Sequence, residues 1–177
     1  MAKKLSRTLI SRVECEELCR RLGAEITRDY QGRKPLFIGV LRGAFIFMAD
    51  LIRHVDLDLS VDFISVSSYG MATESSGVVR IVKDVEENIE GRDIIIVEDI
   101  IDTGLTLKKL TELLATRGPR SIALCTAFDK PERRQVEIDV RYCGRQIPDE
   151  FIVGYGLDYA GAYRNLPDVR VVEEIEA

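Results

Sequence analysis

Residues 93–106 read Asp-Ile-Ile-Ile-Val-Glu-Asp-Ile-Ile-Asp-Thr-Gly-Leu-Thr. Within residues 93–97, the four residues after Asp93 are apolar without interruption, and a strand that is apolar on both faces is typical of the middle of a parallel sheet. Two acids and two apolar residues then lead into a loop at 102–106, and leucines at 107, 110 and 114 form the stripe of a helix behind it. A buried strand, a short loop and a helix predict an α/β fold.

The rest of the chain repeats this alternation of strands and helices. Ser11 and Glu14 have capping-box spacing ahead of a helix with apolar residues at every fourth position. We expect a further helix over 44–55 and strands over 36–41, 59–68, 78–82, 121–128, 136–142 and 151–153. The last dozen residues are expected to be a surface tail. Together these elements predict a mainly parallel twisted sheet, flanked by helices and joined by right-handed crossovers.

Composition limits the class of protein. The 177 residues are 46% hydrophobic and 31% charged, which fits one globular domain over 1–177 and excludes disordered, collagen-like and coiled-coil chains. The net charge of −5 argues against unspecific binding to nucleic acid or acidic membranes. The longest apolar run, 44–49, is far shorter than the roughly 20 residues of a membrane span. The basic start at residues 1–6 has no apolar stretch behind it, so we do not expect it to be a secretory signal. We therefore expect a soluble cytoplasmic domain.

Cysteine and histidine usage narrows the chemistry. The four cysteines, at 15, 19, 125 and 143, have no zinc-finger spacing, so buried free thiols are expected. His54 is the only histidine and lies near an expected helix end, where a structural role is favoured. Acid–base chemistry is therefore expected from carboxylates or lysines.

The loop at 102–106 has the features of a phosphate site. It lies beyond the carboxyl end of a parallel strand, where open α/β sheets bind ligands, and its backbone N–H groups open onto a helix N-terminus. Glu98 and Asp99 add carboxylates that suit a cation or sugar hydroxyls. A plainer interpretation is that Asp102 or Thr103 only caps the helix and that the acids are solvated. The glycine-rich loops of common ATP and dinucleotide sites are absent.

An apolar strand, two acids, two apolar residues and Asp-Thr-Gly-x-Thr together resemble the phosphoribosyl-pyrophosphate signature of the type I phosphoribosyltransferases. Within that family the chain is most similar to the branch that acts on hypoxanthine and guanine. The resemblance runs from about residue 36 to residue 164 and involves four separate patches. It implies the type I phosphoribosyltransferase fold, in which a small hood accompanies the sheet.

The resemblance also implies a role for each patch. Arg42 belongs to a pyrophosphate loop that has a cis peptide before this residue, although many members carry lysine here. Ser68 and Tyr69 belong to a mobile catalytic loop, and Lys130 donates to the exocyclic oxygen of a 6-oxopurine. Taken alone, Lys130 would be interpreted as a surface lysine.

The last patch implies the base site and the end of the pyrophosphate site. Phe151 stacks on the purine, the backbone of Ile152 reads the base edge, Asp158 reaches a magnesium ion and Arg164 binds pyrophosphate. The complete implied substrate-binding set is Leu41, Arg42, Gly43, Ser68, Tyr69, Glu98, Asp99, Thr103, Gly104, Leu105, Thr106, Lys130, Phe151, Ile152, Asp158 and Arg164.

The implied reaction transfers the phosphoribosyl group to hypoxanthine or guanine and yields IMP or GMP plus pyrophosphate. Asp102 is the implied general acid/base at the purine N7, and Glu98, Asp99 and Asp158 are the implied Mg2+ ligands. The implied partners are these small molecules and further copies of the chain, in a homodimer or homotetramer, without nucleic acid or membrane.

Three alternatives share parts of the pattern. Xanthine-guanine phosphoribosyltransferases have the same Asp-Thr-Gly-x-Thr core, but residues 151–159 favour the hypoxanthine-guanine branch. An RNA-binding regulator of the same fold lacks the aspartate found here at 102 and should present a basic face. A phospho-acceptor receiver domain has acids near its first strand, whereas all three acids here lie within five residues. One donor to a 6-oxo group accepts hypoxanthine, guanine and xanthine alike, so the sequence does not rank these bases.

Overall fold

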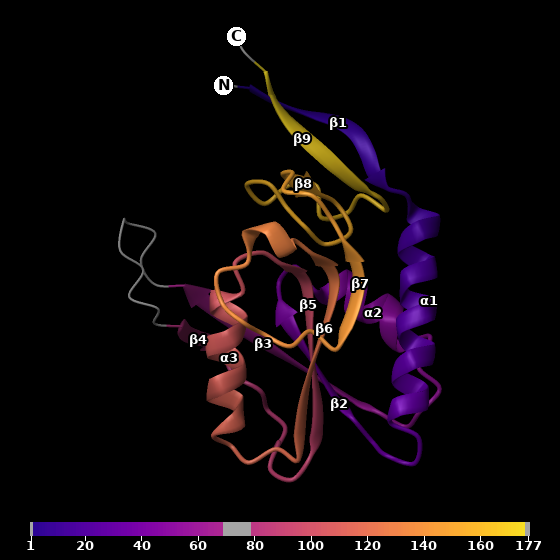
Figure 1. The fold of residues 1–177 in the computed structure, drawn as a ribbon, viewed down its shortest axis with the longest axis vertical. Coiled ribbons are helices and arrows are strands. Elements are labelled where there is room, and N and C mark those ends of the chain that lie inside the picture. The colour runs from indigo at the N-terminus through magenta and orange to yellow at the C-terminus, as the bar shows by residue number, and fades with distance from the viewer. Residues whose placement is uncertain (1, 69–78, 176–177) are drawn as a thin grey trace.

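The computed structural model of the chain describes residues 2–68 and 79–175. Its main element is a six-stranded sheet in the order β4-β3-β2-β5-β6-β7 (Figure 1). Five of its strands run parallel to one another: β2 (Leu36–Leu41), β3 (Ser60–Ser68), β5 (Asp93–Ile101), β6 (Ser121–Asp129) and β7 (Tyr142–Gln146). The edge strand β4 (Val79–Lys83) pairs antiparallel with β3. The predicted α/β sheet is confirmed.

Helices cover both faces of this sheet. α1 (Arg12–Asp29) and α2 (Phe45–Ile52) lie on one face, and α3 (Leu105–Ala115) lies on the other (Figure 1). In β5, Ile95 and Val97 are buried in the cluster that includes α1 and α2. Ile94 and Ile96 are buried in the cluster that includes α3. This two-sided burial explains the uninterrupted apolar run of the central strand.

A smaller sheet forms the hood. Its strands are β1 (Ala2–Ile10), β9 (Val169–Ile175) and β8 (Ile152–Val153), in that order and all antiparallel. The two chain ends lie side by side at the top of Figure 1. The expectation of a surface tail was wrong, because Val169 and Val171 are buried and β9 pairs on both sides. β1 was not anticipated, since its sequence alternates poorly and its partner lies at the far end of the chain.

Two boundaries in the main sheet also differ from expectation. β5 continues through the acids to Ile101 instead of ending at Val97. The strand expected over 136–142 begins only at Tyr142. Val136 and Ile138 instead lie against Gly104, so this segment covers the start of α3 without pairing as a strand. Alternation of apolar and polar residues indicates that one face of a segment is buried. It does not show whether the backbone of that segment pairs with another strand.

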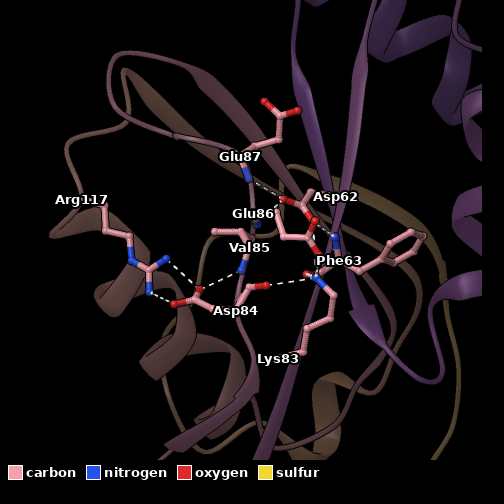
Figure 2. A network of polar contacts seen from close by, with 8 residues as sticks. All are labelled: Asp62, Phe63, Lys83, Asp84, Val85, Glu86, Glu87 and Arg117. Atoms are coloured by element: carbon pink, nitrogen blue, oxygen red, sulfur yellow. Dashed lines mark hydrogen bonds and ion pairs between the residues drawn. The ribbon is translucent and has the colours of Figure 1, made fainter.

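A polar network anchors the antiparallel edge of the sheet (Figure 2). Asp62 on β3 is buried and accepts backbone N–H bonds from Phe63, Glu86 and Glu87 at 2.6, 2.7 and 2.9 Å. Burial opposes its charge, yet these bonds hold the pKa of Asp62 below its usual value. Behind it, Arg117 makes two 2.8 Å bonds to Asp84. The network therefore ties β3, the loop after β4 and the end of α3 together.

The cysteines are free as expected, but one of them, Cys143, is only half-buried. All four are free, Cys15, Cys19 and Cys125 are buried, and burial raises the pKa of Cys15 to about 12. His54 lies exposed just beyond α2. In the described part of the chain, no helix is both long enough and apolar enough to cross a membrane.

Candidate active site

The predicted residues gather at the carboxyl ends of the parallel strands. β2 ends at Leu41 and leads into Arg42 and Gly43, and the peptide bond between Leu41 and Arg42 is cis. β5 ends beside residues 102–106, and β6 ends just before Lys130. Because these strands are adjacent and parallel, their ends meet at one edge of the sheet.

The loop between β5 and α3 forms a small cavity. Gly104 is the N-cap of α3, with a φ of 81°, and no side chain caps the helix. The Leu105 N–H lies 3.4 Å from the Thr103 hydroxyl, and Leu105 and Thr106 are exposed at the first turn. A cavity of about 150 Å³ is lined by Glu98, Gly104 and Thr106, among others. Free N–H groups and hydroxyls around a small cavity suit a phosphate.

Asp102 is not the cap of this helix. Its Oδ1 accepts a 2.9 Å hydrogen bond from Nε of Arg133, a residue of the 3-10 turn η1 (Pro131–Arg133). The plainer interpretation of Asp102 as a helix cap is therefore wrong, since Gly104 takes that position. The Asp102 carboxylate is half-exposed and lies beside the cavity.

Glu98 and Asp99 are adjacent, half-buried carboxylates near the end of β5. Burial and the neighbouring Asp99 raise the pKa of Glu98 well above its usual range, and burial raises the pKa of Asp99 as well. Glu98 lines the small cavity, whereas Asp99 lies against Gly43. Because both residues are half-buried, the plainer interpretation that these acids are fully solvated does not fit. A cation near them would relieve the cost of their charges.

The loop after β2 and the hood meet at two glycines. A Cβ on Gly43 would lie 1.6 Å from Asp99 Oδ2, so only glycine allows this approach. A Cβ on Gly156 would lie 2.2 Å from the Gly43 carbonyl, and Gly156 has a φ of 100°. Arg164 donates to the Gly156 carbonyl at 2.6 Å. These contacts bring the first and last predicted patches together.

Asp158 is engaged within the hood. Its Oδ1 pairs with Arg164 Nη2 at 2.7 Å, and its Oδ2 accepts the Gly161 N–H at 2.7 Å. Among residues 2–68 and 79–175, no three His, Cys, Asp or Glu side chains form a group that could hold a metal ion. Asp158 already has two partners within the hood, Arg164 and the backbone of Gly161.

The base side is built from β6, η1 and the start of β8. Lys130 is only 7% exposed, and its ammonium donates to the Glu150 carbonyl at 2.7 Å. Phe151 remains 46% exposed, and its ring meets Tyr159 edge-on at 5.7 Å. The following residue, Ile152, is buried in β8. The Lys130 ammonium thus bonds the residue before Phe151, and an exposed ring together with an ammonium donor suits the face and the edge of a planar base.

Some residues stand apart from this arrangement. Tyr69 lies outside the described residues, and Ser68 is the last residue of β3. A larger cavity of about 540 Å³ lies between α1, α2 and the hood and contains none of the predicted residues. Arg133 and Asp149 were not predicted from sequence. Their only signal is proximity in the chain to Lys130 and Phe151.

Sequence comparisons agree with the resemblance. A family model, the phosphoribosyl transferase domain, matches residues 11–160. The hypoxanthine-guanine phosphoribosyltransferase of Staphylococcus aureus (strain Mu50) is 48% identical over 167 residues, covering 94% of this chain and 93% of that protein. The protein of the same name from Staphylococcus epidermidis (strain RP62A) is 50% identical over the same length and coverage.

Solved structures are similar over nearly the whole chain. A hypoxanthine-guanine phosphoribosyltransferase from Bacillus anthracis, with HEPES in its active site, has a TM-score of 0.92 and 46% identity, covering 98% of this chain and all of that one (100%). A hypoxanthine phosphoribosyltransferase from Staphylococcus aureus has a TM-score of 0.93 and 47% identity, covering 96% of this chain and 92% of that one.

Proposed function

Since the chain belongs to the phosphoribosyl transferase family, and within it to the hypoxanthine-guanine phosphoribosyltransferases, we propose that it is a purine salvage enzyme. It is a pentosyltransferase that converts hypoxanthine or guanine and phosphoribosyl pyrophosphate to IMP or GMP and pyrophosphate. Because the site takes residues from both sheets, we propose that they act as a single domain.

The assignment of roles to these residues rests on how three groups lie at one edge of the main sheet. The N-terminus of α3, which no side chain caps, lies beside the half-buried pair Glu98 and Asp99, and the buried Lys130 directly follows the neighbouring strand β6. A phosphate, a ribose and a 6-oxopurine need these three environments at one sheet edge. We propose that residues 103–106 hold the 5′-phosphate and that Glu98 and Asp99 hold the ribose hydroxyls.

The reaction transfers a phosphoribosyl group from pyrophosphate to a nitrogen atom of the purine. We propose that the bond to pyrophosphate breaks ahead of bond formation, which leaves positive character on the ribose. Arg42 and Arg164 stabilise the departing pyrophosphate. Asp102 takes the N7 proton of the base as general base, and Phe151 stacks on the purine face. The 5′-phosphate contributes binding energy at a distance from the reacting carbon.

Mg²⁺ is the proposed cofactor. Glu98 and Asp99, with Asp158 from the hood, are the proposed ligands. The adjacent, half-buried carboxylates of Glu98 and Asp99 support this proposal because burial and their mutual repulsion oppose their charges, which a divalent cation would offset. When bound, Mg²⁺ supplies charge stabilisation for the pyrophosphate.

Removing the metal should abolish turnover. We expect excess chelator to stop IMP formation from hypoxanthine, and added Mg²⁺ to restore it, because the departing pyrophosphate needs a divalent cation. The assay follows nucleotide by absorbance, with magnesium-saturated chelator as the control. Full activity in excess chelator would remove the metal from the mechanism.

Base choice tests both the function and the role of Lys130. The wild type, incubated with phosphoribosyl pyrophosphate, Mg²⁺ and each of hypoxanthine, guanine, xanthine and adenine, should reject adenine strongly. An ammonium group donates but cannot accept, so the 6-amino group of adenine would leave it unpaired. Sites of this kind discriminate by about 10⁴-fold in kcat/KM. Comparable kcat/KM for adenine and hypoxanthine would contradict the role of Lys130.

The alternatives fit less well. The relatives carry the hypoxanthine-guanine name, which favours that branch over xanthine-guanine enzymes. Asp102 is present, and the net charge of −5 disfavours an RNA-binding regulator. We further propose a cytoplasmic homodimer or homotetramer, and the four free cysteines support a reducing compartment. Light scattering on purified protein would give the oligomeric state.

A further inference from the structure

Four charged side chains form a continuous chain along the base side of the site. Arg133 Nε donates to Asp102 Oδ1 at 2.9 Å, and Arg133 Nη1 lies 3.6 Å from Asp149 Oδ2. The other oxygen of Asp149 lies 3.5 Å from Lys130 Nζ. This series of charged contacts therefore joins Asp102, the proposed general base, to Lys130, the proposed donor to the purine oxygen.

Backbone hydrogen bonds place Arg133 over Asp102. The Lys130 N–H donates to the Ile101 carbonyl at 2.9 Å, and the Gln135 N–H donates to the Thr103 carbonyl at 3.0 Å. These two carbonyls flank Asp102, so the turn η1 is held on both sides of this residue. The contact between Arg133 and Asp102 is thus set by the path of the backbone as well as by attraction of charge.

The chemistry of the purine base explains why Asp102 and Lys130 would be linked by charged side chains. The O6 and N7 atoms of a 6-oxopurine are neighbours on one edge of the ring. An ammonium has three donors, and that of Lys130 directs two toward Glu150 and Asp149, which leaves one for O6. Among the described residues, Asp102 accepts hydrogen bonds only at Oδ1, which leaves Oδ2 for the proton at N7. Two groups that read adjacent atoms must be held at a fixed spacing.

We propose that Arg133 and Asp149 are positioning residues for phosphoribosyl transfer, and this rests on the proposed function. Arg133 orients the carboxylate of Asp102 toward the base. Asp149 holds Arg133 and Lys130 at the spacing that N7 and O6 require. Neither positioning residue takes a proton from the substrate.

The ion pair itself contributes little to folding. The side chains of Arg133 and Asp102 are 49% and 44% exposed, and exposed pairs stabilise proteins weakly. A matched control exists in Arg145 and Glu14, which lie 2.7 Å apart with 47% and 48% exposure and away from the site. Loss of activity on removing Arg133 would therefore report on the site and not on lost stability.

The test compares Arg133→Gln, Arg133→Lys and Arg145→Gln in the full-length enzyme with hypoxanthine, phosphoribosyl pyrophosphate and Mg²⁺. Arg133→Gln should lower kcat roughly ten- to a hundredfold, as expected for a misplaced catalytic group, with KM for phosphoribosyl pyrophosphate unchanged. Arg133→Lys should recover part of the loss, and Arg145→Gln should match the wild type. Melting temperatures should be similar for all of them.

Double variants separate positioning from a general structural effect. In an Asp102→Asn background, Arg133→Gln should have no further effect on kcat, because Arg133 acts through that carboxylate. Asp149→Asn should raise KM for hypoxanthine as well as lower kcat, because it also holds Lys130; Asp58→Asn, in the exposed pair with Lys34, is its control.

Two results would overturn the inference while leaving the transferase assignment intact. One is wild-type kcat, or a higher one, in Arg133→Gln. The other is an equal loss of kcat on Arg133→Gln in the wild-type background and in the Asp102→Asn background. A wild type that forms no nucleotide from hypoxanthine or guanine would instead overturn the proposed function, and the inference with it.

Discussion

Replacing Asp102 with asparagine should lower kcat by about 10²–10⁴-fold, equivalent to roughly 3–5 kcal/mol of barrier. Asparagine keeps the size of the side chain and can still face Arg133, but it cannot take a proton. Because Gly104 and not Asp102 is the N-cap of α3, the phosphate loop should keep its shape. Steady-state kinetics with hypoxanthine measure the loss.

Thr106→Ala is the matched comparison for Asp102→Asn. Thr106 is exposed at the first turn of α3 and lines the small cavity, so its loss should weaken binding of phosphoribosyl pyrophosphate. Asp102→Asn should instead bind phosphoribosyl pyrophosphate within a few-fold of the wild type. Calorimetric titration distinguishes the two. Unchanged kcat in Asp102→Asn would place the proton chemistry elsewhere, even if the enzyme is a phosphoribosyltransferase.

Gly43→Ala should lower kcat/KM by at least about 10²-fold, since displacements of about 1 Å have that effect on positioned groups. The new Cβ would lie 1.6 Å from Oδ2 and 2.4 Å from Cγ of Asp99, so either the loop or the carboxylate must move. Asp99 lies on the central strand β5, which restricts its movement. Overpacking should also reduce the free energy of unfolding by roughly 1–3 kcal/mol.

Gly91→Ala is the control for Gly43→Ala, because it replaces a glycine without placing the new Cβ against a neighbouring atom. Gly91 has a φ of 69°, and no atom lies within 4 Å of the place that a Cβ would take, so alanine there meets backbone strain but no neighbour. We expect a small loss of stability and unchanged kcat/KM. Gly43→Ala with wild-type kcat/KM would show that Asp99 can move freely, which would argue against Asp99 as a fixed ligand.

Local sequence was sufficient where structure and chemistry depend on neighbouring residues. The four apolar residues from Ile94 to Val97 predicted a strand buried on both faces, and the capping box at Ser11 located the start of α1. The loop between β5 and α3 was also predicted from residues 102–106, because a strand end, a glycine and a helix start are adjacent in the chain; its binding of phosphate stays a prediction.

Features that depend on distant partners were missed. Nothing near Asp149 indicates that it meets Arg133 and Lys130, since that contact depends on how η1 and the turn before β8 pack together. The segment at 136–140 alternates as a strand does, but its apolar side chains cover α3 and Gly104 instead. The burial of Lys130 likewise follows from tertiary packing and not from its local sequence.

The pairing of the two chain ends has a consequence for how the enzyme forms. Leu5 pairs with Val172, and β9 in turn pairs with β8, which directly follows Phe151. Contacts between residues so far apart in sequence close very long loops, and such contacts slow folding. During synthesis, β1 must wait for β9 before it can pair. We therefore expect the parallel sheet and its phosphate loop to form first, and the purine pocket to be completed last.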